Sequence, residues 1–260
     1  MSIMINNSRN TRIIHFLTYS DNNFFIARER LVNEAKLFNE FTTINSLGPE
    51  NLNDEFKNTY KNILNQPRGA GYWIWRSLII QNLLDKIKEN EYILYLDAGC
   101  KLNSEGKKRF FEYLNILDNS NYGILSFAMS GNYGPGTFCR ERDWTVREIF
   151  QYFNIEQDSK IAKSAQLLGG VFIIKKNNHS KYFINLMLQA IKNNPEMFTD
   201  KYNDNNQEHY FNDNRHDQSV SSILRKIIGT ALINCDETWM PPWNGDFALQ
   251  FPFWAPRLRN

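Results

Sequence analysis

Short apolar runs and amphipathic stretches alternate along the chain, and this alternation limits the fold more than any other feature of the sequence. The runs Arg12–Ser20, Tyr92–Leu96 and Tyr122–Met129 are rich in β-branched and aromatic residues, which is typical of buried strands. Between residues 24 and 41 the apolar positions recur at three- and four-residue spacing, which predicts an amphipathic helix. The alternation predicts an α/β domain whose mostly parallel sheet is flanked by helices.

The same pattern continues to the end of the chain. Further strands are expected over Leu168–Ile174 and over residues 229–234. The late segments are expected to add antiparallel strands or an acceptor-side subdomain. Further helices are expected at residues 78–87, 104–117, 144–154, 179–194 and 217–227. Loops are expected at the Gly- and Pro-containing segments 44–56, 67–71 and 131–143 and at the polar segment 193–214. The aromatic, Pro-broken residues 239–254 predict a C-terminal arm.

Charge and cysteine content narrow the possible partners and compartment. The net charge of +2 and the absence of a Lys/Arg block predict no nucleic-acid partner. The three cysteines, Cys100, Cys139 and Cys235, form no CxxC pair, which suits free thiols in a reducing compartment. The first 20 residues lack the apolar core of a signal peptide, and no run approaches the roughly 18 apolar residues of a membrane span. We therefore expect a cytoplasmic protein.

Asp97 directly follows a predicted buried strand, in the stretch YILYLDAGC. Ligands of open α/β sheets bind at the carboxyl ends of the strands, so this carboxylate could hold a divalent cation or a ribose hydroxyl. It could equally cap the following turn. Many cation sites of this kind carry two acids as D-x-D, whereas here Gly99 occupies the second position.

The stretch RGAGYWIWR places two arginines around a Gly-rich aromatic segment. Arg68 and Arg76 have the forked guanidinium groups that suit phosphate oxygens. Tyr72, Trp73 and Trp75 could border a ligand, or they could anchor the next helix in the core.

Two later motifs also place polar or small residues at the ends of elements. RHDQS opens a predicted helix, where Asp217 could be the N-terminal cap or a general base, and His216 a metal ligand or a hydrogen-bonding group. The pair Gly169–Gly170 enters a buried strand, which indicates either close approach of a ligand to the backbone or tight internal packing.

The order GYWxW[K/R], LDAG, WTxRxxF, a Gln before GGVFI, and RHDQS resembles a family of bacterial nucleotide-sugar glycosyltransferases of the capsule and lipopolysaccharide type. The resemblance extends from about residue 13 to 228, and the later half is also similar to the glycogenin and lipopolysaccharide galactosyltransferase superfamily. It implies a GT-A-like, Rossmann-like fold in a single domain over 1–260. The nucleotide-binding half would span about 12–130, and the half for the donor sugar and acceptor about 131–260.

The resemblance also implies roles for individual residues. Thr18 and Tyr19 would dock the base and ribose, Arg68 and Arg76 the diphosphate, and Asp97 the ribose or a metal–diphosphate. The whole set expected to bind the donor is Thr18, Tyr19, Arg68, Tyr72, Trp73, Arg76, Asp97, Gly99, Gln166, Gly169 and Gly170. The residues expected to act in catalysis are Asp217, His216 and Gln218.

The activity so implied is transfer of a sugar from a nucleoside diphosphate sugar, with UDP favoured, to a hydroxyl of a glycan or lipid-linked acceptor. In an inverting reaction Asp217 would take the hydroxyl proton, and in a retaining one it would steady the positive charge on the sugar. A lipid-linked acceptor would bring the protein into peripheral contact with the inner membrane surface. The aromatic arm has the Trp and Phe residues for such contact, but core packing is the favoured role for it, and a lid, an acceptor groove or a dimer contact is also open.

The expected cofactor is Mn²⁺ or Mg²⁺ at Asp97. Two departures from the family pattern bear on it: Gly99 replaces the second acid, and no histidine follows His216. Arg257 and Arg259 could supply positive charge instead.

Two other functions remain open from the sequence. A sugar nucleotidyltransferase shares the α/β layout, although no Gly-rich loop with Lys or Arg follows the first strand. The single acid at Asp97 also leaves open a catalytically inactive glycan- or nucleotide-sugar-binding protein on the same fold.

Overall fold

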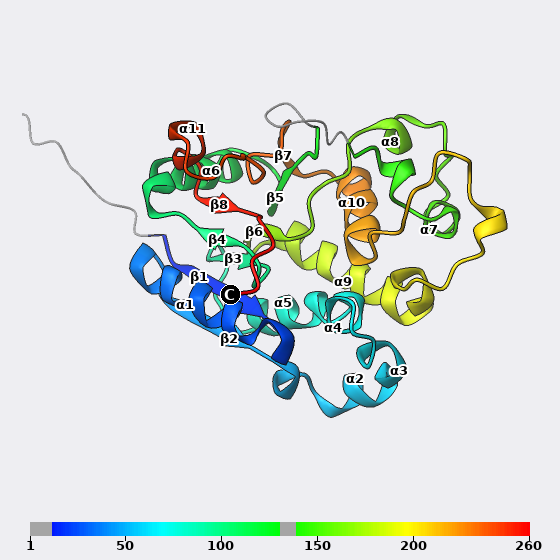
Figure 1. Cartoon of the computed structure of the whole chain (residues 1–260), viewed down its shortest axis with the longest axis horizontal. Helices are drawn as coiled ribbons and strands as arrows, with labels where there is room; N and C mark the ends of the chain where they lie inside the picture. The colour runs from blue at the N-terminus through cyan, green and yellow to red at the C-terminus, as the bar shows by residue number, and fades with distance from the viewer. Residues whose placement is uncertain (1–11, 131–138) are drawn as a thin grey trace, which may run out of the picture.

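The computed structural model describes residues 12–130 and 139–260 (Figure 1). The sequence predicts no signal peptide in the first 20 residues. Residues 1–11 of that segment lie outside the described residues. The greater part of the Gly- and Pro-rich loop expected at 131–143 also lies outside them.

A six-stranded sheet forms the centre of the molecule (Figure 1). In spatial order its strands are β2 (Thr43–Leu47), β1 (Ile14–Tyr19), β3 (Tyr92–Leu96), β6 (Val171–Lys175), β5 (Ile124–Phe127) and β7 (Ala231–Ile233). Neighbouring strands are parallel, except that β6 runs opposite to both β3 and β5. The mostly parallel α/β sheet expected from the sequence is thus confirmed.

Helices cover both faces of this sheet. The α-helices are α1 (Phe25–Phe38), α2 (Asp54–Thr59), α3 (Lys61–Leu64), α4 (Gly69–Tyr72), α5 (Arg76–Leu84), α6 (Lys107–Asp118), α7 (Arg147–Tyr152), α8 (Lys160–Lys163), α9 (Asn178–Asn193), α10 (Asp217–Ile228) and α11 (Asp246–Leu249). Short 3₁₀ helices span Asn22–Phe24, Pro49–Asn51, Ser104–Gly106, Glu141–Asp143, Pro195–Phe198 and Asp204–Asn206.

The alternation of side chains along each strand divides the core into two layers. On β1, Leu17 and Tyr19 pack with α5, α9 and α10, whereas Phe16 packs with α1 and α6. Burying apolar area on both faces is the main stabilising contribution to such a sheet. Packing on both faces also fixes the carboxyl ends of β1 and β3, where the predicted ligand-binding residues Thr18, Tyr19 and Asp97 lie.

One strand was missed by the sequence pattern. The loop expected at 44–56 is wrong over its first residues, because β2 continues to Leu47 and pairs with β1 from His15–Thr43 to Tyr19–Leu47. Its side chains are half-buried or exposed and do not alternate, so the sequence carries no strand period there. The preceding helix ends earlier than expected, at Phe38, because Asn39 adopts a left-handed conformation.

The aromatic arm packs onto the body of the molecule rather than extending from it. Its strand β8 (Phe253–Trp254) pairs antiparallel with β4 (Lys101–Leu102), which follows the Asp97 loop. Phe253 enters the layer formed with α1 and α6, and Trp254 forms a small cluster with Met240 and Phe251. Across residues 12–130 and 139–260, every helix is too short or too polar to traverse a bilayer.

Candidate functional site

Asp97 lies at the carboxyl end of β3, where the sequence predicts a ligand-binding carboxylate. Its Oδ1 accepts hydrogen bonds from the hydroxyl of Tyr95 at 2.5 Å and from Nη2 of Arg76 at 2.8 Å. The Asp97 side chain remains 31% exposed, while that of Arg76 is only 4% exposed. The carboxylate is therefore fixed from the protein side and open on the other.

Arg76 joins Asp97 to a second acid that is remote in the sequence. Its Nη1 donates to Oδ2 of Asp217, the first residue of α10. Its Nε is buried and has no partner among the described residues. We call Arg76, Asp97 and Asp217 the acid–arginine cluster.

Burial dominates the electrostatics of this cluster. It raises the pKa of Asp217 to about 7; Arg76 opposes this rise, and the negative charge of Asp97 adds to it. Burial would lower the pKa of Arg76, but Asp217 and Asp97 together raise it well above its ordinary value. The guanidinium therefore stays charged, and Asp217 exchanges a proton near neutral pH.

The glycine pair Gly169–Gly170, just before β6, lets the backbone lie close to Asp97 and to Gln218, the residue after Asp217. A Cβ on Gly170 would lie 2.9 Å from Oδ2 of Asp97, and one on Gly169 would lie 2.8 Å from Cβ of Gln218. The Gly169 amide instead donates to Oε1 of Gln218 at 2.8 Å. Any side chain at these positions would displace Asp97 or Gln218.

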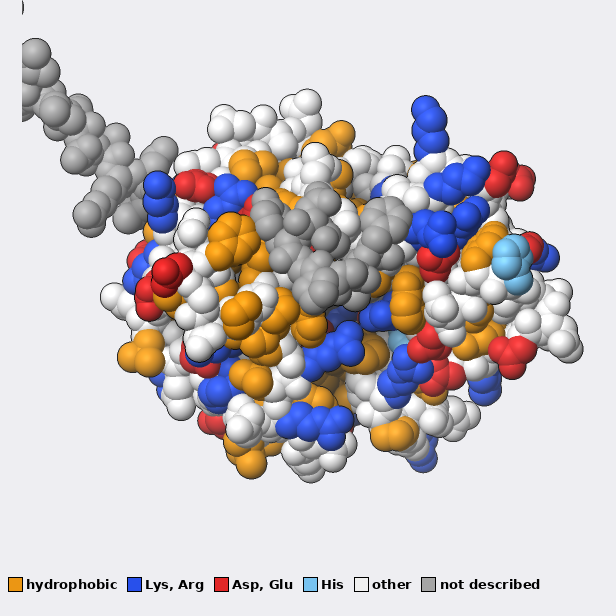
Figure 2. Space-filling model, turned by 45° about the horizontal axis from the view of Figure 1, so that its top comes forward, with side chains coloured by type: hydrophobic (Ala, Val, Ile, Leu, Met, Phe, Trp, Pro, Cys, Tyr) orange, Lys and Arg blue, Asp and Glu red, His pale blue; other side chains and the backbone are white. Residues whose placement is uncertain are grey.

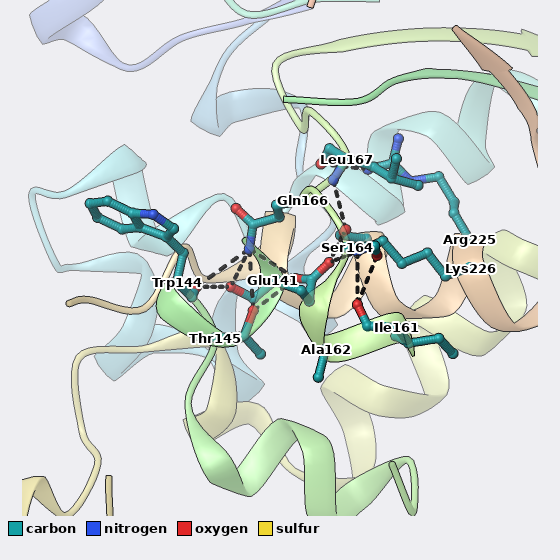
Figure 3. A network of polar contacts seen from close by, with 12 residues as sticks. Glu141, Trp144, Thr145, Ile161, Ala162, Ser164, Gln166, Leu167, Arg225 and Lys226 are labelled. Carbon is teal, nitrogen blue, oxygen red and sulfur yellow. Dashed lines mark hydrogen bonds and ion pairs between the residues drawn. The ribbon is translucent and has the colours of Figure 1, made fainter. Parts of the chain in front are cut away.

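Gln166 joins Gln218 to a buried polar network. Oε1 of Gln166 accepts from Nε2 of Gln218 at 2.6 Å. Nε2 of Gln166 donates to Glu141 at 3.0 Å and to Thr145 at 3.2 Å (Figure 3). Glu141 is fully buried and is paired with Lys226 at 2.6 Å. A carboxylate can only accept, so Glu141 fixes which way the Gln166 amide points, and through it the Gln218 amide.

The segment between Arg68 and Arg76 contains α4, whose backbone is a left-handed turn rather than a regular α-helix. Residues 69–73 all have positive φ, although only Gly69 and Gly71 among them are glycines. The turn packs Tyr72 on the ring of His216, with ring centroids 4.9 Å apart, and Trp73 nearby at 5.8 Å. Left-handed backbone costs about 1–2 kcal/mol per non-glycine residue, so the surrounding packing must hold it.

His216 faces away from the acid–arginine cluster. Its Nε2 lies 2.8 Å from Asp200, and Asp200 also accepts from Arg68 at 3.0 Å. Arg68 donates in addition to Asp213 at 2.7 Å. Burial lowers the pKa of His216. We call Arg68, Asp200, Asp213 and His216 the outer cluster.

The two residues predicted to dock the base lie at the carboxyl end of β1. Tyr19 stacks on Trp75, with ring centroids 3.8 Å apart, and the Arg76 guanidinium lies 5.8 Å from the Trp75 ring. Thr18 faces the other layer; it is fully buried, and its Oγ1 has no partner among the described residues.

The residues around Asp97 do not by themselves fit a divalent cation. One oxygen of Asp97 and one of Asp217 are bound by the cation Arg76, which would repel a second cation. Within residues 12–130 and 139–260, no three His, Cys, Asp or Glu side chains are grouped as metal ligands. Gly99 lies against the C-terminal tail: a Cβ there would lie 3.2 Å from Cα of Arg257.

Three supporting residues were not assigned from the sequence. Tyr95 stands two positions before Asp97, so strand alternation places it on the same side, and this signal was available. Glu141 and Asp200 lie in loops far from their partners, and no spacing rule identifies them.

The same fold occurs in a glycosyltransferase. The structure of a glycosyltransferase involved in the glycosylation of the major capsid of PBCV-1 is similar to this chain with a TM-score of 0.52 and 14% sequence identity, over 95% of each chain. At this identity the likeness establishes the fold, and it confirms the fold expected from the resemblance.

Two further structures are more distantly similar. Galactosyltransferase LgtC in complex with donor and acceptor sugar analogs has a TM-score of 0.43 and 11% identity, over 86% of this chain and 74% of that one. Mouse xyloside xylosyltransferase 1 has a TM-score of 0.44 and 12% identity, over 93% and 84%. No protein-family model matches the chain, and no curated protein sequence matches it.

Proposed function

We propose that this protein is a glycosyltransferase that moves a sugar, most simply a hexose, from a nucleoside diphosphate sugar to a hydroxyl of a glycan or lipid-linked acceptor. UDP is the favoured nucleotide, and surface polysaccharide synthesis in the cytoplasm is the favoured setting. The observation that carries the proposal is the acid–arginine cluster, which stands at the carboxyl end of β3 beside Gly169–Gly170 and Gln218, in a fold shared with a glycosyltransferase.

The chemistry requires a fixed donor and a group that handles the acceptor proton. Tyr19 and Trp75 are buried and stack on each other, which fixes the backbone from which Arg76 reaches Asp97. Asp97 is partly exposed, and its Oδ2 suits a ribose or sugar hydroxyl. A general base works best when its pKa lies near the operating pH, and that of Asp217 is raised to about 7. In a retaining reaction the leaving diphosphate takes the proton, and Asp217 instead stabilises the positive charge that develops on the sugar.

Ligand-induced stabilisation tests the donor directly. Melting temperatures are measured with UDP, GDP, CMP and dTDP and their common sugars, each with and without Mn²⁺. Stabilisation by one nucleotide and its sugar, followed by release of that sugar to water or an acceptor, supports the proposal. Binding without any turnover would favour an inactive binding protein. Turnover of a nucleoside triphosphate with a sugar 1-phosphate would favour a nucleotidyltransferase.

Asp97→Asn and Asp217→Asn test the site within this function. Each should lower the transfer rate by at least about 100-fold, since removal of a positioned acid–base or polar group has effects of that size. Asp213→Asn, in the outer cluster, is the matched control and should keep most of the rate. Near-normal transfer by both site variants, each shown to be folded, would overturn the assignment.

A further inference from the structure

Two arginines in segments that adjoin the acid–arginine cluster form no ion pair with the described residues. Neither the Arg215 nor the Arg257 side chain forms an ion pair or hydrogen bond with the described residues, whereas Arg68, Arg76, Arg109, Arg140 and Arg147 all pair with carboxylates. The segments outside the described residues, 1–11 and 131–138, contain no Asp or Glu that could supply one.

Each of these arginines belongs to a segment whose backbone lies next to one of the two acids in the chain or in space. Arg215 precedes Asp217 by two residues, and its carbonyl accepts from the Gln218 amide at 3.1 Å. Arg257 lies against the loop after Asp97: its Cα would be 3.2 Å from a Cβ on Gly99, and the next residue, Leu258, donates to the Gly99 carbonyl at 2.9 Å. Figure 2 shows Lys and Arg side chains around a hollow near the middle of one face of the molecule.

The two arginines differ in their surroundings: the Arg215 side chain is half-buried, whereas the Arg257 side chain is exposed to solvent. The Arg215 guanidinium lies over the ring of Trp144, 4.0 Å from its centroid. Arg257 has a φ of +59°, an uncommon conformation for a residue with a side chain. Burial lowers the pKa of Arg215; the charge of Arg257 also lowers it, while Cys139 and Asp213 act in the opposite direction.

We propose that Arg215 and Arg257 together bind the diphosphate of the donor and take the place of a metal ion. This inference rests on the proposed function. Guanidinium groups bind phosphate oxygens through paired, charge-assisted hydrogen bonds, and an anion between these two would relieve their repulsion. The acid–arginine cluster does not provide this charge, because both outer nitrogens of Arg76 are already bound by carboxylates.

The pair would act on the leaving group during transfer. The bond between C1 of the sugar and the diphosphate oxygen breaks, and its electrons remain on that oxygen. The acceptor oxygen forms the new bond to C1, and its proton passes to Asp217 or to the departing diphosphate. Arg215 and Arg257 stabilise the added negative charge on the diphosphate, where a preorganised cation is most effective.

Calorimetric titration in EDTA tests the inference. The probes are the nucleoside diphosphate selected by the melting-temperature panel, its monophosphate, and inorganic pyrophosphate. Arg215→Gln and Arg257→Gln should each weaken diphosphate binding by about tenfold or more, and should affect the monophosphate less. Arg147→Gln removes the same charge at the start of α7, which lies away from β3 in Figure 1, and should leave diphosphate binding unchanged. Circular dichroism verifies that every variant is folded.

The outcomes separate this inference from the proposed function. Nucleoside diphosphate binding that requires Mn²⁺, or that is unchanged in both variants, would overturn the arginine site while the glycosyltransferase proposal stands. Binding of pyrophosphate that depends on Arg215 and Arg257, without binding of any nucleotide or nucleotide sugar, would overturn the proposed function and the assignment to a nucleotide donor.

Discussion

The acid–arginine cluster and the outer cluster have the same composition at their centres: one arginine between two aspartates. Both arginines border the left-handed turn 69–73, and one aspartate of each lies at or near the start of α10. They differ in burial. The Arg76 side chain is 4% exposed and that of Arg68 is 43% exposed.

Because the two clusters differ in burial, the same set of charges contributes differently to the stability of the fold. Exposed ion pairs contribute little because water and salt screen them, whereas a buried charge without its partner is very costly. The pKa values follow the same division. That of Asp217 is raised by burial, whereas that of Asp213, despite partial burial, is lowered by its hydrogen bond with Arg68. Of the aspartates in the two clusters, Asp217 is the one whose pKa burial brings near neutral pH.

Removal of each arginine should give the largest difference between the clusters. Arg76→Gln leaves two carboxylates without a counter-charge, and should lower the free energy of unfolding by about 3–5 kcal/mol. Arg68→Gln, the matched change in the outer cluster, should cost less than about 1 kcal/mol. Urea denaturation at pH 7.5 measures both.

A second set of variants isolates the charge effect at Arg76. Combining Arg76→Gln with Asp97→Asn and Asp217→Asn should recover much of the lost stability, since no buried charge is then unpaired. Equal losses for Arg76→Gln and Arg68→Gln would contradict the comparison.

The left-handed turn connects the clusters, so breaking it should disturb both. In Gly71→Ala the new Cβ would lie 2.7 Å from Cα of Leu64, and the alanine would have to adopt a φ of +95°. This change should lower the free energy of unfolding by about 2 kcal/mol. Ala70→Gly is the control, because glycine suits the φ of +50° there; its stability should stay within about 1 kcal/mol of the original. A Gly71→Ala protein of unchanged stability would show that the turn relaxes freely.

The pH dependence of stability should have opposite signs in the two clusters. Between about pH 4 and 7 the folded protein binds more protons at Asp217 than the unfolded chain does, so this group's contribution falls as pH rises, by at most about 1.4 kcal/mol per pH unit. Asp213 stabilises the fold above its unfolded pKa, and this contribution is lost as pH falls below about 4.

Urea denaturation across pH 3–8 separates these contributions. Asp217→Asn should flatten the curve between about pH 4 and 7 relative to the original protein, and Asp213→Asn should flatten it only in the acid range. A slope between pH 4 and 7 that persists in Asp217→Asn would assign the titration to another group.

The sequence predicts the elements of the site better than their connections. Strand period and position predicted that Asp97 ends a core strand, and the helix that begins at Asp217 was also predicted. The bond between Arg76 and Asp217 could not be predicted, because it joins residues 141 positions apart and depends on how α5 and α10 pack. For the same reason β2 was missed: its pairing with β1, rather than any pattern of its own, makes it a strand.

The insertion of β6 between β3 and β5 has a consequence for how the molecule is made. Until β6 has been synthesised, β3 and β5 have no partner between them, and each exposes an unpaired backbone edge that can associate with other chains. A fragment that stops before β6 should therefore aggregate rather than form a small nucleotide-binding unit. Non-local pairing of this kind also slows folding. The contact between Gly170 and Asp97 should therefore form late in folding.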